Sequence, residues 1–345
     1  MRRPAVTNLY QKLGPEFAVS FPSAMHIMLA ISALHLAYLR PNERQKYMTL
    51  SSRHQQNSIQ QLSGAIQNLT KELIIPVFMT SALLPIACLA DMCLARHNSE
   101  SPPHLEDVFS IFSLIRGVRD ILYPIWPLLS DPDIQPIIEP IIDKYILHNN
   151  DHYPLPSPLA ERMALLRNSM LESLTTYHDG SKEACHFAIL ELEKVIRDIA
   201  HVPPSEEGQY SADYRKRTDI ELGVLLKWQT TVSATFVGLL KKEHTAALIV
   251  LAHWVMLVRH LGHKWFLEGW AKMALELIRR KVGEKNLQWM EFPEEYLRAV
   301  ETSDDELMQT AGVEANTQML RGDEARAGAE ERANEKIFAS PTPFP

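Results

Sequence analysis

Apolar residues recur at three- and four-residue steps through most of this 345-residue chain, with prolines and polar clusters between the apolar segments. Such spacing is typical of amphipathic α-helices, whereas half-buried strands alternate apolar and polar residues at every second position. The pattern predicts helices over residues 22–40, 43–69, 73–95, 104–122, 159–177, 182–200, 218–240, 245–261 and 265–282. We therefore expect an all-α protein with little or no sheet.

Two of the predicted helices carry a one-sided apolar stripe that should face a core. In the range 43–69 the stripe consists of Tyr47, Leu50, Ile59, Leu62, Ile66 and Leu69. In the range 265–282 it consists of Phe266, Trp270, Met273 and Leu277. The helix predicted over 245–261 is apolar on all sides, so it should lie at the centre of the protein.

Proline and charge mark the boundaries between the predicted parts of the chain. Eight prolines between Tyr123 and Pro158 forbid long helices and predict a Pro-rich connection between two helical clusters, at about 20–122 and 159–300. Residues 1–19 are a predicted N-terminal extension. Residues 301–345 hold ten acidic and four basic residues and almost no large apolar side chains, which predicts an acidic, disordered tail.

Charge and cysteine content narrow the classes of function. The formal net charge is -7, yet residues 1–300 contain 31 basic and 32 acidic residues, so no basic footprint for nucleic acid is visible. Three scattered cysteines favour a reducing compartment and provide neither a disulfide framework nor a structural zinc site. No signal peptide opens the chain, so we expect it to stay inside the cell.

One segment, Leu73 to Ala90, is uncharged over about the length that could span a bilayer. Its two prolines, its Thr-Ser pair and the flanking Glu72 and Asp91 favour a buried helix kinked at Pro85 instead. We therefore predict a water-soluble helical bundle with no membrane span.

The stretch from Ala247 to Ile278 holds three histidines, His253, His260 and His263, which raises the question of a zinc or catalytic site. No carboxylate or cysteine shares their helix face, which favours the alternative of a buried, hydrogen-bonded His253 and two polar residues at a helix end. No nucleophile elbow, phosphate-binding loop or HExxH motif occurs. We therefore expect no catalytic residues, no metal site and no cofactor in this chain.

One competing signal lies in the predicted tail. The segment "SDDEL" at Ser303 resembles the start of the aspartate-rich magnesium motif of all-helical prenyl-diphosphate enzymes, but Met308 stands where another aspartate would be needed. A solvated run of charge is the favoured explanation of the segment. The alternative function that it leaves open is an all-helical enzyme acting on isoprenoid or other hydrophobic substrates.

Five segments resemble, in the same order, the C-terminal regulatory domain of fungal zinc-binuclear-cluster transcription factors, particularly the sterol uptake control group. They are "HIMLAISALHLAYLRP", "YMTLSSRHQ", "LIRGVRDIL", "ALIVLAHWVMLVRHLGHKWFLEGWAKMALELI" and "WMEFPEEYL". The similarity covers about residues 20–300, and the fourth segment is its most specific part. The six-cysteine zinc cluster that members carry near their N-terminus is absent from this chain, so direct nucleic-acid binding is not expected of it.

The resemblance implies an all-helical regulatory domain in the nucleus, shuttling with the cytoplasm, that forms homodimers and takes a sterol or another hydrophobic small molecule into an apolar pocket. Candidate pocket residues are Trp254, Met256, Trp265, Trp270 and Met273, although these residue types are also usual in a packed core. The expected function is transcription regulation, with control of sterol uptake or of a biosynthetic gene cluster for secondary metabolism.

Two alternatives stay open for how such a chain would reach DNA. It is either the regulatory half of a longer DNA-binding factor or a stand-alone member that acts through the transcription machinery or a DNA-binding partner.

Overall fold

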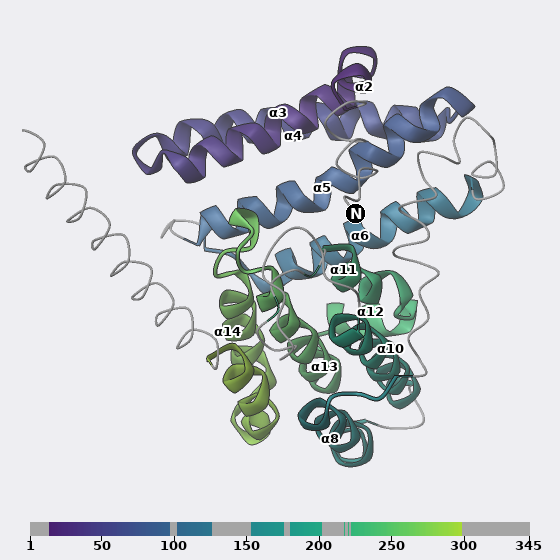
Figure 1. The fold of residues 1–345 in the computed structure, drawn as a ribbon, viewed down its shortest axis with the longest axis vertical. Coiled ribbons are helices and arrows are strands. Elements are labelled where there is room, and N and C mark those ends of the chain that lie inside the picture. Colours follow the sequence, from purple (N-terminus) through teal and green to yellow (C-terminus); the bar gives the residue numbers. More distant parts are fainter. Residues whose placement is uncertain are drawn as a thin grey trace, which may run out of the picture. The chain divides into compact units, whose positions relative to one another are not determined.

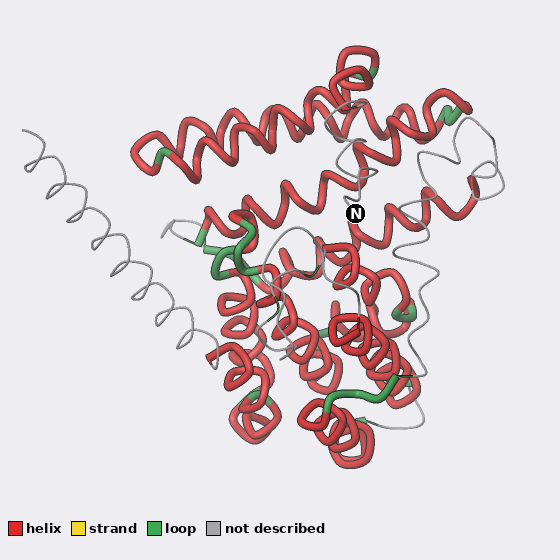
Figure 2. Tube along the Cα trace, viewed as in Figure 1, coloured by secondary structure: helices red, strands yellow, loops and turns green. Residues whose placement is uncertain are grey.

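The computed structural model describes residues 14–96, 102–125, 153–175, 180–201, 217, 220 and 222–298. Every regular element within these residues is a helix and no strand occurs among them, as Figure 2 shows, which confirms the predicted all-α class. The chain divides into two units, Met1–Glu294 and Glu295–Pro345, a boundary that falls a few residues before the predicted end of the helical domain. Most of the predicted N-terminal extension and of the Pro-rich connection, and the whole predicted acidic tail, lie outside the described residues.

The N-terminal half of the first unit is a helical hairpin packed on a long apolar helix (Figure 1). The hairpin consists of α3 (Pro22–Leu39) and α4 (Arg44–Gln67), and the apolar helix is α5 (Ile74–Ala95). Pro41 begins the short 3-10 turn η2 (Pro41–Glu43) between α3 and α4, because proline disfavours the helical conformation of the residue before it. The predicted helices over 22–40, 43–69 and 73–95 are thus confirmed.

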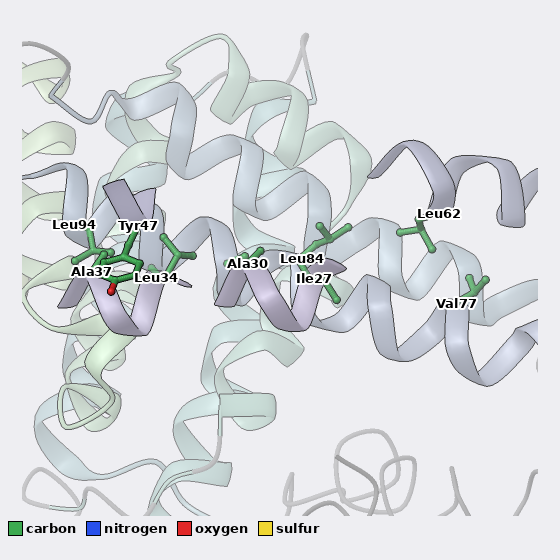
Figure 3. Close-up of a cluster of buried hydrophobic side chains, with 11 residues drawn as sticks. Ile27, Ala30, Leu34, Ala37, Tyr47, Leu62, Val77, Leu84 and Leu94 are labelled. Carbon is green, nitrogen blue, oxygen red and sulfur yellow. The ribbon is translucent and has the colours of Figure 1, made fainter. Parts of the chain in front are cut away.

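Small and branched apolar side chains fill the space between these three helices. The buried cluster consists of Ile27, Ala30, Leu34 and Ala37 of α3, Tyr47 and Leu62 of α4, and Val77, Leu84, Ala87, Ala90 and Leu94 of α5 (Figure 3). The four alanines allow the helix backbones to approach closely, and each fully buried leucine or isoleucine contributes about 1.5–3 kcal/mol. This core holds the hairpin on α5.

The apolar stripe predicted on α4 is partly wrong, because Leu50, Ile59 and Ile66 are exposed. The buried side of α4 carries the small polar residues Ser51 and Ser58 beside Tyr47 and Leu62. The hydroxyl of Ser23 donates to the carbonyl oxygen of Ser58 at 2.7 Å, and the hydroxyl of Ser58 donates to the carbonyl oxygen of Ser23 at 2.9 Å. Both serines are fully buried, and their small size permits a close crossing that a search for apolar periodicity overlooks.

α5 continues through Pro85 and packs within the unit against α3, α4, α6 (Leu105–Ile125) and the turn η9 (Trp265–Leu267). By length and composition, Pro22–Leu39 and Lys71–Ala95 could each cross a membrane. The bent pair Ala234–Lys241 and Thr245–Leu261 passes the same test as a broken span. The lack of a membrane span therefore stays a prediction, supported by the burial of α5 among helices of its own chain.

In the C-terminal half of the first unit α10 matches its predicted range, whereas several other helices are shorter than the sequence pattern predicts. The main helices are α10 (Ser181–His201), α11 (Leu222–Thr231), α12 (Ala234–Lys241), α13 (Thr245–Val255) and α14 (Trp270–Val282). The range 159–177 holds α8 (Ser157–Leu165), a π-helical turn η6 (Leu166–Met170) and α9 (Leu171–Leu174). The range 218–240 is divided because the side chain of Ser233 accepts a hydrogen bond from the backbone N–H of Phe236 and so caps a new helix.

The helix predicted over 265–282 begins five residues later, at Trp270. Gly269 has a φ of 68°, in the left-handed region that favours glycine, and this residue separates η9 from α14. The buried face of α14 shifts accordingly to Trp270, Ala271, Ala274, Leu275, Ile278 and Val282. Two residues of the predicted face, Met273 and Leu277, are only half-buried. The predicted helix over 245–261 likewise changes after Val255 into the 3-10 helix η8 (Met256–Leu261).

Candidate functional site

Three buried tryptophans from three helices meet at the centre of the C-terminal half. The rings of Trp228 (α11) and Trp254 (α13) stack with centroids 5.8 Å apart, and Trp270 (α14) meets Trp254 edge-on at 6.1 Å. Phe112 of α6 packs edge-on against Trp228 at 5.6 Å and against Trp254 at 5.8 Å. Each such aromatic pair contributes about 0.5–1.5 kcal/mol beyond the area that it buries. The cluster therefore ties four helices of the unit together.

A small cavity lies beside this aromatic cluster. The rings of Phe112, Trp254 and Trp270 line it, together with aliphatic side chains from α5, α6, α11, η8 and η9. Gln229 is the one polar side chain, other than the tryptophan indoles, among the described residues of the lining, and none of these residues is charged. An apolar lining with very few polar groups is typical of sites for hydrophobic small molecules.

The volume of the cavity limits what it holds in this conformation. It measures about 10 Å³, which is close to the least that accommodates one water molecule. Leu222 and Leu226 of α11 are half-buried, whereas most of the other lining side chains are buried. We call these two leucines the outer wall of the cavity because they are the partly exposed residues of its lining, and displacing them would give a larger molecule a way in.

The structure brings together two of the five predicted pocket residues. Trp254 and Trp270 line the cavity, and Met256, Trp265 and Met273 do not. Met256 is buried in η8, and Met273 is half-buried on α14. Trp265 lies next to α3 instead, with its ring centroid 4.9 Å from His35 and 5.9 Å from Tyr38.

The prediction placed Trp265 on the same helix as Trp270, and the break at Gly269 separates the two side chains. Sequence reasoning also missed Phe112, Trp228 and Gln229. Phe112 is one of the apolar residues that recur at helical spacing in the range 104–122, but such spacing does not indicate which helix they meet.

His253 is fully buried on α13, and both of its ring nitrogens have partners. Its Nδ1 lies 2.8 Å from the carbonyl oxygen of Ile249, one helical turn earlier, and its Nε2 accepts from Nε of Arg162 at 2.9 Å. Burial, and then the charge of Arg162, lower the pKa of His253 to about 3. The imidazole is therefore neutral at pH 7, with both nitrogens engaged inside the protein.

The other two candidate histidines do not join His253 in a metal site. His260 is buried with its Nδ1 2.7 Å from the carbonyl oxygen of Arg217, whereas His263 is exposed. No group of three or more His, Cys, Asp or Glu side chains that could hold a metal ion occurs within the described residues. The "SDDEL" segment lies outside the described residues, so the enzyme alternative is not addressed by the fold.

Comparison with known proteins finds no relative: no family model, no curated protein and no solved structure matches the chain. The described residues define an all-α protein with an apolar cavity beside an aromatic cluster. The resemblance to a regulatory domain rests on the five sequence segments.

Proposed function

We propose that the chain is an all-helical regulatory domain of the transcription-regulator type that responds to a hydrophobic small molecule bound in the cavity beside Trp254 and Trp270. The observation that carries the ligand part of this proposal is the meeting of these two candidate residues at one apolar cavity. The regulatory part is supported by the sequence resemblance. A sterol or another hydrophobic metabolite is the ligand class that both considerations favour.

Ligand entry requires the cavity to open, because about 10 Å³ is far below the volume of a metabolite. Rotation of the half-buried Leu222 and Leu226 would open the outer wall of the cavity without unpacking the buried tryptophans. A ligand that binds only the open conformation shifts the population toward it. We propose that this shift changes the surface presented to the transcription machinery, to a DNA-binding partner or to a second copy of the chain in the nucleus.

Thermal unfolding with a panel of sterols and other hydrophobic metabolites tests the ligand. At a concentration of about 100 times Kd, a ligand of the folded state adds about 2.7 kcal/mol, which raises the unfolding midpoint by several degrees. Val258→Phe, which fills the cavity from η8, should reduce the shift relative to its own unliganded midpoint. Leu50→Ala, at an exposed site on α4, should leave the shift intact. Stabilisation by no compound in the panel would remove the ligand from the proposal.

A reporter assay tests regulation separately. The full chain is fused to an unrelated DNA-binding domain, and reporter activity is measured in cells with and without the stabilising compound. We expect activity to depend on the compound in the wild type and to lose this dependence in Val258→Phe. Unchanged activity with a compound that binds in vitro would contradict the regulatory role and leave the binding site standing.

A further inference from the structure

The three tryptophans of the aromatic cluster differ in the hydrogen bonds of their indole N–H groups. Trp228 donates to the carbonyl oxygen of Ala188 at 2.8 Å, and Trp254 donates to that of Leu225 at 3.1 Å. Trp270 is only 1% exposed, and its indole N–H is buried without an acceptor. A buried donor without a partner is uncommon and costs free energy, so this one requires an explanation.

The position of Trp270 supplies that explanation, because Trp270 is one of the residues that line the cavity. The other polar side chain in the lining, Gln229, is satisfied when its amide nitrogen is assigned to face the carbonyl oxygens of Leu225 and Leu226, to which it then donates at 3.0 Å and 3.1 Å. Among the described lining residues, Trp270 is therefore the one whose side-chain N–H has no hydrogen-bond acceptor. A water molecule is a poor partner here, since a buried water needs two to four polar contacts.

We propose that the N–H of Trp270 is the polar anchor of this site and donates a hydrogen bond to an oxygen of a neutral, otherwise apolar ligand. The inference rests on the proposed function, because it specifies the chemistry of the molecule in the same cavity. A ketone, ether or hydroxyl oxygen meets the requirement. A carboxylate or phosphate does not, because the lining contains no positive charge to offset the desolvation of an anion.

Two probes of nearly the same shape isolate this hydrogen bond. Cyclohexanone carries an acceptor oxygen where methylenecyclohexane carries a CH₂ group. Both are titrated against the full chain and against Leu226→Ala, which shortens a side chain of the outer wall and enlarges the cavity. The measured quantity is the ratio of the Kd of methylenecyclohexane to the Kd of cyclohexanone. A variant that only changes the size of the site alters both Kd values alike and therefore leaves this ratio unchanged.

Trp270→Phe keeps an aromatic ring and removes the N–H, and we expect it to lower this ratio roughly 3- to 10-fold. Trp228→Phe is the matched control, because Trp228 belongs to the same cluster, does not line the cavity and already has an acceptor. It should leave the ratio unchanged. An unchanged ratio in Trp270→Phe would overturn the anchor while the cavity remains a binding site. If neither probe binds to the wild type or to Leu226→Ala, both the proposed ligand site and the anchor are overturned.

Stability without ligand provides a second, independent measurement. Trp228→Phe removes an existing hydrogen bond to the carbonyl oxygen of Ala188, whereas Trp270→Phe removes a donor that had no partner. The midpoint of thermal unfolding should therefore fall further in Trp228→Phe than in Trp270→Phe. An equal or larger fall in Trp270→Phe would mean that the N–H is satisfied in the unliganded protein, which contradicts the anchor.

Discussion

Arg162 donates from Nε to Nε2 of His253 across 2.9 Å, and this hydrogen bond joins α8 to the last turn of α13. The same guanidinium donates to the carbonyl oxygen of Trp289 at 2.8 Å and lies 5.4 Å from the ring centroid of Phe292. The ring of Phe292 is nearly parallel to that of His253, with centroids 6.2 Å apart. His253 is thus part of a network that locks the C-terminal helices together.

Removing the side chain of Arg162 should destabilise the protein, because Nε2 of His253 would remain buried without its hydrogen-bond donor. We expect Arg162→Met to lower the free energy of unfolding by about 1–3 kcal/mol, measured by urea denaturation. Arg279→Met is the matched control, since Arg279 pairs with Glu294 at 2.6 Å near the surface and such pairs contribute about 0–1 kcal/mol. Equal losses in the two variants would show that the bond to His253 contributes nothing specific.

Asp91 and His253 should act on stability with opposite dependence on pH. Burial raises the pKa of Asp91 to about 6, although Gln55 donates to its Oδ2 at 2.5 Å. A raised pKa in the folded state means that Asp91 stabilises the fold below about pH 4 and that this contribution is lost as the pH rises to about 6. The lowered pKa of His253 gives a contribution that is complete above about pH 6.5 and is lost as the pH falls toward 3.

The variant Asp91→Asn separates the two effects, because it removes only the carboxyl group. One pKa unit corresponds to about 1.4 kcal/mol, so the stability of Asp91→Asn relative to wild type should rise by up to about 3 kcal/mol between pH 4 and pH 6.5. Urea denaturation at half-unit pH intervals measures this difference. A difference that stays constant across the interval would mean that Asp91 titrates alike in the folded and unfolded chains.

The sequence predicts the helices of this fold better than their ends and their neighbours. The apolar run of α3 between Pro22 and Pro41 and the periodicity along α6 are strong enough to define these elements, and they favour the all-α class. The break at Gly269 was missed because a positive φ at one glycine leaves the apolar spacing on either side unchanged. The cap at Ser233 was missed for a similar reason, since a single serine is compatible with a continuous helix.

The candidate site was harder to predict than the fold. Trp254 and Trp270 were selected as large side chains suited to an apolar pocket, and both line the cavity. Trp265 was placed on one continuous helix with Trp270, whereas it lies in η9 and does not line this cavity. Phe112 and Leu226 come from helices more than 100 residues apart in sequence, and a one-dimensional pattern does not indicate that they meet.

A side chain at Gly269 should destabilise the fold. Its φ of 68° is strained for other residues, and a Cβ at this position would overlap the guanidinium of Arg96, which donates to the carbonyl oxygen of Glu268. We expect Gly269→Ala to lower the free energy of unfolding by about 1–3 kcal/mol. Gly64→Ala is the matched control, because Gly64 lies in α4 with open space around it and should gain about 0.5–1 kcal/mol. A neutral Gly269→Ala would show that the loop before α14 adjusts freely.

Where α3 packs on α4, we expect an apolar-to-polar substitution to be tolerated and a polar-to-apolar substitution to be damaging, which reverses the usual expectation. Ser58 is fully buried and exchanges hydrogen bonds with Ser23, whereas the adjacent Ile59 is 48% exposed. Ser58→Leu should cost about 1–3 kcal/mol, because the added carbons force apart two closely packed helices and break both hydrogen bonds. Ile59→Ser should change the free energy of unfolding by no more than about 0.5 kcal/mol. Urea denaturation of the two variants tests the register directly, since a stripe formed by Leu50, Ile59 and Ile66 would make Ile59→Ser the more damaging change.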